Sequence, residues 1–443
     1  MHTQEQTSPM SRTIQSAARA RKSENTMNTE CYAAELAFDW GDQTHAFALQ
    51  GAGAKIETGS LGASPESLHG WMEQLGERFK GQPVTLAVEA GRNALMHALL
   101  AYPWLVIYPV HPATSQHFRE AFVPSGAKDD LPDALVLLNI LTQHRNLLRP
   151  LKCDTAETRK LHALVTARRA AVDRRTQLGN ELRSLLKGFY PQALELCGDD
   201  MASPLALDFL ARWPQLKSLQ AARPSTLRDF YFAHNVRRPD VVASRLERIA
   251  GARALTADPA VIQPSVLQVQ LFVAVLRPMQ KHIAVLDDHI AEAFAVHPDA
   301  AIFRSLPGAG PALAPRLLVG FGADRSRYPL ATSIQKFSGI APVTVRSGKQ
   351  LWIHWRWNAP VFLRQTFVEW AGQTVVHCPW AKAFYRQQRD AGKRHQAALR
   401  ALAFKWIRIV WRCWQSRIPY NEATYIDALA RRHSPIINTL SSS

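Results

Sequence analysis

The sequence contains few cysteines and no paired-cysteine motif. Its 443 residues include neither a Cys-x-x-Cys pair nor a His-x-x-x-His partner for one. This spacing argues against a structural zinc site and against a disulfide framework. The five cysteines are scattered along the chain, at Cys31, Cys153, Cys197, Cys378 and Cys413.

Long apolar runs are also missing. No run approaches the length of a membrane span, and the first 30 residues lack the apolar core of a signal peptide. These residues are rich in Ser, Thr, Gln and Arg, so residues 1–30 are predicted to be a flexible tail. We therefore expect a cytoplasmic protein that has no membrane segment.

Acidic residues are scarce relative to basic ones. Lys and Arg number 53 against 36 Asp and Glu, which gives a formal charge of +17 and an isoelectric point near 10.0. Such an excess favours a polyanionic partner, and nucleic acid is the leading candidate. The alternative is a basic surface that only maintains solubility. The chain of 443 residues is long enough for two or three folded domains, and its composition is otherwise that of an ordinary globular protein.

The first folded region has a pattern typical of an α/β sheet. Three β-type runs, "CYAAELAFDW", "THAFALQ" and "AKIETGSL", predict a meander. A helix over residues 65–78, the strand "VTLAVEA", a helix near residues 95–100 and the strand "WLVIYPV" follow. Alternation of strands and helices predicts a mixed or parallel sheet.

Two long helices are predicted from apolar spacing after this region. Arg168 and Arg175 interrupt the seam of the first helix, and Pro278 should kink the second. The helices could pair as an antiparallel coiled-coil arm, or they could be core helices of a bundle. The seams are Leu161, Leu164, Ala171, Leu178, Leu182 and Leu185 within residues 155–187, and Phe272, Leu276, Met279, Ile283, Leu286 and Ile290 within residues 267–295.

Four carboxylates occupy positions from which they can converge. Asp39 ends the first predicted strand and Glu89 ends "VTLAVEA", and strand ends carry the ligand site in open α/β sheets. Asp130 and Asp133 share one face of a helix that is predicted to begin near Lys128. The sequence therefore predicts one site built from all four.

Crowded carboxylates need a neutralising partner. Like charges held together cost free energy, and hard oxygen ligands select Mg²⁺ or Mn²⁺. Two such ions could activate and stabilise the oxygens of a phosphodiester under attack. The alternative is that Asp129 or Asp130 only caps the helix.

The blocks "AFDWGDQTHAFAL", "AVEA" and "AKDDLPDALVLL" resemble the transposase family of the Piv-type DNA invertases, which includes bridge-RNA-guided recombinases of insertion sequences. In that family the third block reads Lys-Thr-Asp-x-x-Asp-Ala. Lys128, Asp130, Asp133 and Ala134 match it, and Asp129 replaces the Thr. The resemblance implies a ribonuclease-H-like domain of the RuvC type, in which the DEDD acids are catalytic metal ligands.

The resemblance continues in a C-terminal transposase domain, through "SLPGAGPALAPRLLVGFG", "QKFSGIAPVTVRSGK" and "CPWAKAFYRQQRDAGKRHQAALRALAFKWIRIV". It places a serine nucleophile at Ser347, where Arg346 and Lys349 could hold the attacked phosphate. A turn serine beside Gly348 is the alternative, and Ser338 is the rival nucleophile.

Two further features of this region are candidate nucleic-acid contacts. Gly308 and Gly310 in "LPGAGPALAPRLL" would let backbone amides approach a phosphate, and the alternative is a plain loop. The last long helix has an apolar stripe, interpreted as core, and a basic face that is either solvated or bound to nucleic acid. The basic face consists of Arg400, Lys405, Arg408 and Arg412.

The expected organisation is a tail, a RuvC-like domain over residues 31–150, a helical region over 151–300 and a serine domain over 301–443. The expected function is site-specific DNA recombination on duplex DNA, at element ends and target, by a homo-oligomer (dimer or tetramer) in the cytoplasm and its nucleoid. The resemblance leaves open whether a structured guide RNA takes part. The alternatives are a metal-dependent structure-selective nuclease and a non-catalytic nucleic-acid-binding protein derived from a transposase.

Overall fold

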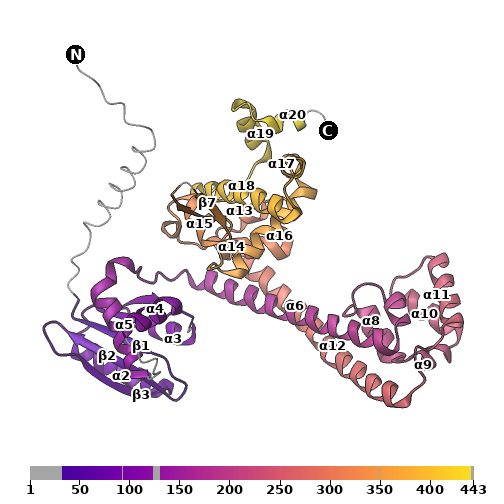
Figure 1. Ribbon diagram of the computed structural model, residues 1–443, viewed down its shortest axis with the longest axis horizontal. Helices are drawn as coiled ribbons and strands as arrows, with labels where there is room; N and C mark the ends of the chain where they lie inside the picture. Colours follow the sequence, from indigo (N-terminus) through magenta and orange to yellow (C-terminus); the bar gives the residue numbers. More distant parts are fainter. Residues whose placement is uncertain (1–31, 92, 123–129, 349, 441–443) are drawn as a thin grey trace. The chain divides into compact units, whose positions relative to one another are not determined.

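A computed structural model describes residues 32–91, 93–122, 130–348 and 350–440. The chain divides into two compact units, residues 1–153 and 154–443, and Figure 1 shows their elements in sequence colours. The predicted tail, Lys128, Asp129 and Lys349 lie outside the described residues, as does the side chain of Asp130.

A five-stranded sheet forms the centre of the first unit, in the order β3-β2-β1-β4-β5. Neighbouring strands β1, β2 and β3 are antiparallel, whereas β1, β4 and β5 are mutually parallel. This arrangement confirms the mixed α/β sheet predicted from the sequence. The strands are β1 (Ala34–Asp39), β2 (Thr44–Gly51), β3 (Glu57–Gly62), β4 (Val84–Glu89) and β5 (Leu105–Val110).

Helices cover both faces of this sheet because side chains alternate along its strands. Leu36 and Phe38 pack with Met72 of α2 in one apolar cluster. Ala37 packs with Leu138 of α5 in the cluster on the other face. The helices of the first unit are α2 (Pro65–Arg78), α3 (Asn93–Leu99), α4 (Pro112–Phe122) and α5 (Asp130–His144), followed by the 3-10 turn η1 (Arg145–Leu147).

Two long antiparallel helices, α6 (Ala156–Phe189) and α12 (Pro259–Ala295), run side by side in the second unit (Figure 1) and are called the helix pair below. Leu161 of α6 shares one apolar cluster with Ile290 of α12. At the far end, Leu182 of α6 shares a second cluster with Leu276 of α12. The predicted apolar seams therefore face each other.

Charged residues interrupt the α6 seam and find partners there. The guanidinium of Arg168 makes a two-pronged ion pair with Asp287 of α12, in which Nη2 lies 3.2 Å from Oδ2. Arg175 makes an ion pair with Asp200 at 2.5 Å and also donates to the carbonyl oxygen of Ala202 at 3.2 Å. By length and composition alone α12 could cross a membrane, but its apolar seam packs on α6, so this is weak support for a span.

Five short helices close the far end of the helix pair and are called the tip. Phe209, Trp213 and Phe230 contact one another edge to face within its core. Such aromatic contacts add to the stabilisation gained from apolar burial. The helices are α7 (Gln192–Cys197), α8 (Pro204–Arg212), α9 (Leu216–Gln220), α10 (Pro224–Ala233) and α11 (Pro239–Gly251).

A helical bundle around buried tryptophans follows the helix pair. The indole N–H of Trp370 donates to Pro307 O at 3.0 Å and that of Trp406 donates to Thr374 Oγ1 at 2.9 Å, so these buried polar groups are satisfied. The apolar stripe of α18 is core, as expected from the sequence. The elements are α13 (Ala300–Arg304), α14 (Gly310–Phe321), η2 (Arg325–Arg327), α15 (Ala331–Phe337), β6 (Val343–Ser347), β7 (Gln350–His354), α16 (Val361–His377), α17 (Pro379–Asp390), α18 (His395–Ser416), α19 (Glu422–Arg431) and α20 (Pro435–Leu440).

Candidate functional site

Asp39 and Glu89 end two adjacent parallel strands at the same edge of the sheet. In the β1–β4 register Phe38 lies opposite Val88, and each acid is the next residue of its strand. Because side chains alternate, Asp39 falls on the same face as Ala37, the face that α5 covers. Both acids are half-buried. The sheet thus presents two carboxylates at one edge, under one helix.

The first turn of α5 carries the other two predicted acids. Asp133 is buried, and its neighbour Ala134 packs into the cluster between α5 and the sheet. No group of three or more His, Cys, Asp or Glu residues that could hold a metal occurs among the side chains that the structure describes, and Asp130 is not among these. Convergence of all four acids therefore stays a prediction.

Helix α4 contacts two of the acids from a third direction. Ser115 Oγ lies 2.9 Å from Glu89 Oε1, and Arg119 Nη2 lies 2.6 Å from Asp133 Oδ2. The two α4 residues are one helical turn apart, so a single face of α4 reaches both carboxylates. Neither residue is among those that the sequence predicts for the site. The sequence of α4 holds no signal that connects them with these carboxylates.

The donor set of this edge suits a hard divalent cation. Asp39, Glu89 and Asp133 offer carboxylate oxygens, which are the preferred ligands of Mg²⁺ and Mn²⁺. All three are partly or largely removed from solvent, and isolated buried carboxylates are unfavourable without a balancing positive charge. Arg119 already supplies one such charge at Asp133. The residues present fit a metal.

The two candidate nucleophiles differ in accessibility. Ser347 is exposed at the end of β6, opposite Gln350 of β7, and Gly348 beside it adopts the left-handed φ of 58° that favours glycine. Ser338 is fully buried, and its hydroxyl donates to the carbonyl oxygen of Gln335 at 3.3 Å. Only Ser347 of this pair has a hydroxyl that a phosphate can reach.

Of the glycines predicted to approach phosphate, Gly308 lies in the turn between α13 and α14, and Gly310 is the first residue of α14. Gly308 has a φ of 66°, and a Cβ there would lie 3.0 Å from the His377 ring and 3.1 Å from Gln373 of α16. Gly308 therefore has a packing role. Gly310 also has a left-handed φ, of 55°, but a Cβ there would meet nothing within 4 Å. A phosphate contact at these glycines stays a prediction.

The basic residues of α18 fall into two groups. Arg408 and Arg412 are exposed. Lys405 is half-buried, with its Nζ 4.6 Å from the centre of the Phe384 ring, and burial lowers the pKa of its ammonium group. Arg400 lies 4.0 Å above the ring of Trp355. Of the four, Arg408 and Arg412 are the freest to contact a phosphate backbone.

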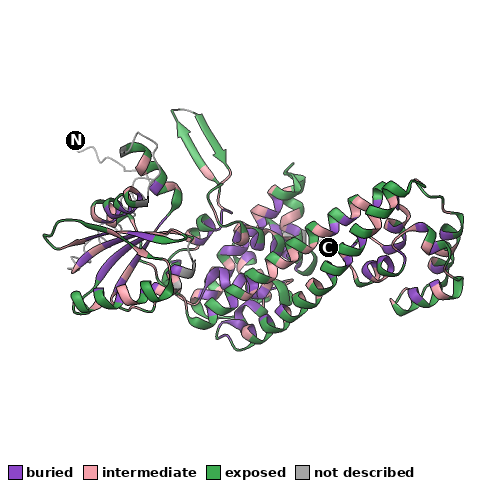
Figure 2. Ribbon diagram, turned by 90° about the horizontal axis from the view of Figure 1, so that it is seen from below, coloured by how far each residue is buried: buried purple, intermediate pink, exposed green. Residues whose placement is uncertain are grey.

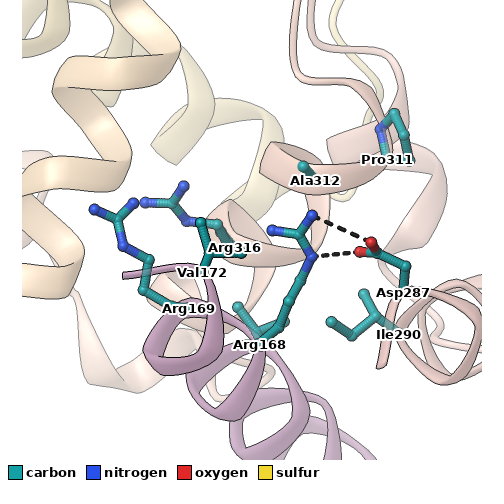
Figure 3. A pocket seen from close by; sticks show the side chains of 9 residues that line it. Arg168, Arg169, Val172, Asp287, Ile290, Pro311, Ala312 and Arg316 are labelled. Carbon is teal, nitrogen blue, oxygen red and sulfur yellow. Dashed lines mark hydrogen bonds and ion pairs between the residues drawn. The ribbon is translucent and has the colours of Figure 1, made fainter. Parts of the chain in front are cut away.

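Three arginines line a cavity of about 150 Å³ where the helix pair meets α14 (Figure 3). Arg168 is held there by Asp287. The other two arginines both bind one carboxylate, since Arg169 lies 3.0 Å and Arg316 lies 2.6 Å from Glu369 of α16. Glu369 therefore connects α6, α14 and α16. This cluster could not be predicted from the sequence, because its members come from four different helices that are far apart along the chain.

Two transposase family models match the chain. The first, designated DEDD_Tnp_IS110 and described as a transposase, matches residues 36–191, which include all four predicted acids. The second, described as the transposase IS116/IS110/IS902 family, matches residues 300–386, which include Ser347. Together the two matches cover more than half of the chain.

Several proteins of insertion elements are similar along most of the chain. The protein named as transposase for the mini-circle IS117 of Streptomyces coelicolor is 28% identical, over 87% of this chain and 94% of its own. A 42 kDa protein of insertion element IS900 from Mycobacterium paratuberculosis is 26% identical, over 78% and 86%. A 43.6 kDa protein of insertion element IS110 from Streptomyces coelicolor is 23% identical, over 88% and 98%.

Proposed function

Because this chain belongs to the IS110 family of transposases and is thus an enzyme of DNA transposition, we propose that it recombines DNA through a covalent phosphoserine intermediate. The nucleophile is Ser347. The carboxylates Asp39, Glu89, Asp130 and Asp133 hold Mg²⁺ or Mn²⁺. The observation that carries the proposal is the placement of Asp39 and Glu89 at one edge of parallel strands, beneath the helix that begins with the other two acids.

The proposed fold of the first unit is a RuvC-type ribonuclease-H-like domain. Its support is the order of elements: an antiparallel meander β1–β3, then the parallel strands β4 and β5, then α5 across the face that carries the strand-end acids. The same order of acids, strand Asp, strand Glu and two helix Asp, led to the family resemblance in the sequence. We extend the proposal to the predicted domains, with the helix pair as an arm and residues 301–443 as the serine domain.

In the proposed reaction Ser347 Oγ forms a bond to the phosphorus of the scissile phosphate. The bond from phosphorus to one bridging oxygen breaks, and the serine proton ends on that leaving oxygen. Hydrolysis would discard the free energy of the phosphodiester, whereas a phosphoserine retains it, so a free strand end can rejoin by the reverse step. A bound divalent cation would supply positive charge for the phosphate oxygens during transfer.

The reaction requires both units, since the acids belong to one and the serine to the other. Arg346 lies beside Ser347 in β6, and its guanidinium is suited to holding a phosphate oxygen. Lys349 follows Gly348 in the sequence and is assigned the same role.

The proposed substrate is duplex DNA, both element ends and target. Seventeen excess positive charges suit a long polyanion, and Arg408 and Arg412 of α18 are exposed for phosphate contact. Gly308 and Gly310 are proposed as further backbone contacts. The exposed arginines Arg408 and Arg412 would also suit a structured guide RNA. Sequencing of the RNA that co-purifies with the protein would identify such a guide. The proposed location is the cytoplasm, at the nucleoid.

The decisive experiment traps the covalent intermediate. Wild-type protein, Ser347→Ala and, as a matched control, Ser338→Ala are incubated with element-end DNA and Mg²⁺ and then denatured. We expect a protein–DNA adduct that maps to Ser347, and neither cleavage nor adduct for Ser347→Ala. Asp39→Asn should also lose cleavage but should still bind DNA, since removing a negative charge cannot weaken attraction to phosphate.

Other outcomes would select another function. Normal cleavage by Ser347→Ala without an adduct would identify a metal-dependent nuclease. An adduct on Ser338 would move the nucleophile to that residue. Binding without cleavage in the presence of either metal would identify a non-catalytic nucleic-acid-binding protein.

A further inference from the structure

The hairpin that carries Ser347 exposes large apolar side chains on both of its faces. Trp352 is 43% exposed, Ile353 70% and, just after the hairpin, Trp357 81%. In Figure 2 the strands β6 and β7 are coloured almost entirely as exposed, and they project away from the helices of the second unit. A two-stranded hairpin is marginally stable alone, and large exposed apolar patches in soluble proteins mark interaction sites.

Arginines surround the aromatic residues at the base of the hairpin. The ring of Trp355 has the guanidinium of Arg400 at 4.0 Å and that of Arg364 at 5.0 Å. The ring centres of Trp355 and Trp357 are 6.4 Å apart. Cation–π contacts hold Trp355 in place, so the exposed Trp357 stands beside a fixed aromatic ring. We call Arg346, Trp352, Trp355, Trp357, Arg364 and Arg400 the tryptophan–arginine surface.

The charge of the surrounding segment selects the class of partner. Residues 325–421 contain 17 Lys and Arg but only two acids, Glu369 and Asp390. Glu369 is already bound by Arg169 and Arg316 in the arginine cavity. Nothing in this segment therefore balances the arginines of the tryptophan–arginine surface except Asp390. A polyanion is the complementary partner.

The exposed indole rings indicate which kind of polyanion binds. Every base has a π-face on which an aromatic side chain can stack, and such stacking is tolerant of sequence. In a duplex those faces are covered by neighbouring base pairs, so a protein ring can reach them only when a base is unpaired or flipped out. Tryptophans interleaved with arginines thus fit an unpaired strand better than a duplex.

We propose that the tryptophan–arginine surface binds an unpaired nucleic-acid strand, with bases stacked on Trp352 and Trp357 and phosphates held by Arg346 and the neighbouring arginines. The inference rests on the proposed function in one respect, because cleavage at Ser347 of the same hairpin would leave an unpaired end beside this surface. In this proposal the hairpin holds the cleaved strand until that strand is rejoined.

The test measures equilibrium binding of full-length protein without divalent metal, so that cleavage plays no part. The probes are fluorescein-labelled oligo-dT, oligo-U and a duplex of equal length. The variants are Trp357→Ala, Trp352→Ala and the conservative Trp357→Phe. Leu255→Ala is the matched control, because Leu255 is also an exposed apolar residue but lies between α11 and α12.

Loss of one stacking ring should weaken single-strand binding about tenfold. We expect that loss for Trp357→Ala and for Trp352→Ala, a change within about twofold for Trp357→Phe and Leu255→Ala, and duplex binding within about twofold for all four. Circular dichroism should show unchanged folding. Binding of oligo-dT at least as tight as that of oligo-U would identify an unpaired DNA strand as the occupant and support the proposal. Clearly tighter binding of oligo-U would identify an RNA strand instead and would overturn the role of the hairpin as holder of the strand to be rejoined.

Three further results would overturn the inference. The first is an unchanged single-strand affinity in both Trp→Ala variants, and the second is an equal weakening of duplex and single-strand binding. The third is a change in oligomer mass with unchanged strand binding, which would make the hairpin an interface between copies of the chain. None of these depends on cleavage. Failure of the adduct experiment with Ser347 would leave this binding result intact, so the two proposals can fail separately.

Discussion

At the scale of single residues, the pairing of Arg119 with Asp133 has a consequence for metal binding. The two groups are 2.6 Å apart, and both side chains are mostly buried. The carboxylate of Asp133 has a second oxygen, but the positive charge of the guanidinium would repel a cation bound beside it. If Asp133 holds the metal as proposed, Arg119 would balance Asp133 in the absence of metal and would compete with the metal for it.

Substitution Arg119→Gln should strengthen metal binding. Removing the competing positive charge should lower the dissociation constant for Mn²⁺ several-fold, about the effect of 1 kcal/mol for a partly exposed ion pair. The matched control is Arg145→Gln, because Arg145 pairs with Glu35 at 3.0 Å at the opposite end of β1. Isothermal titration calorimetry without DNA gives the readout. Weaker binding in Arg119→Gln alone would mean that Arg119 positions Asp133 for the metal.

The predictability of these residues follows from their local patterns. Asp39 and Glu89 could be placed at strand ends because β1 and β4 are apolar runs that each finish on an acid. Ser115 and Arg119 could not, because their roles arise only when α4 folds back over the edge of the sheet. The sequence of α4 is polar and gives no reason to connect it with distant carboxylates.

At the scale of elements, Glu369 joins three helices. It accepts from Arg169 of α6 and from Arg316 of α14, whose guanidinium also donates to Thr366 at 3.2 Å. Burial alone would raise the pKa of Glu369, but the hydrogen bonds and charges of Arg316 and Arg169 outweigh it and hold the pKa below its ordinary value. The ionised carboxylate is thus the form that the fold stabilises.

Substitution Glu369→Gln should lower the free energy of unfolding at pH 7 by about 2 kcal/mol, because it leaves the mostly buried Arg316 without its charged partner. The matched control Asp173→Asn, which removes the exposed partner of Arg169, should cost about 0.5 kcal/mol or less. Urea denaturation provides both values. Equal stability of the two variants would refute a structural role for Glu369.

The pH dependence of the Glu369→Gln effect has a definite sign. A carboxyl group with a depressed pKa in the folded state stabilises the protein above its ordinary pKa of 4.5, and this contribution is lost as the pH falls below that value. The stability difference between wild type and Glu369→Gln should therefore shrink below pH 4.5. A difference that stays constant would contradict the linkage.

The long helices illustrate which elements can be predicted. Apolar residues at steps of three and four predicted both α6 and α12, and the structure shows that their seams meet. Pro278 lies inside α12, which continues past it to Ala295. The five short tip helices were not predicted individually, since each is shorter than four turns and owes its stability to a shared aromatic core.

At the scale of the whole molecule, α12 leaves an apolar stripe uncovered. Leu267, Leu271 and Val275 are exposed and lie four residues apart, so they share one side of the helix. Leu276, by contrast, is fully buried in the chain's own core. The stripe supports the proposed homo-oligomer, because contact with a second copy would remove it from water.

The double substitution Leu267→Glu and Leu271→Glu should therefore reduce the mass of the assembly, measured by light scattering, while leaving the fold intact. Val296→Glu, at a similarly exposed apolar residue just past α12, is the control and should not change the mass. A substitution at Leu276 would instead disturb the core. An unchanged mass in the folded double variant would remove the stripe from the oligomer interface.

The charge of the molecule could be read from its sequence, but the distribution of that charge on the surface could not. Residues 325–421 hold most of the excess, yet Lys405 packs on Phe384 and Arg400 on Trp355, whereas Arg408 and Arg412 remain exposed. Packing between elements decides which basic groups reach solvent. A count of charges therefore indicates a polyanionic partner without identifying its contact residues.

The length of the helix pair beyond its arginine cavity gives that cavity mechanical leverage. The cavity lies at Arg168, Arg169 and Arg316, and α6 continues from Arg168 to Phe189, which at 1.5 Å per residue is about 30 Å. A rotation of the pair by about 10° around the cavity would carry the tip through about 5 Å. A sub-ångström shift in these ion pairs would therefore be magnified several-fold at the tip.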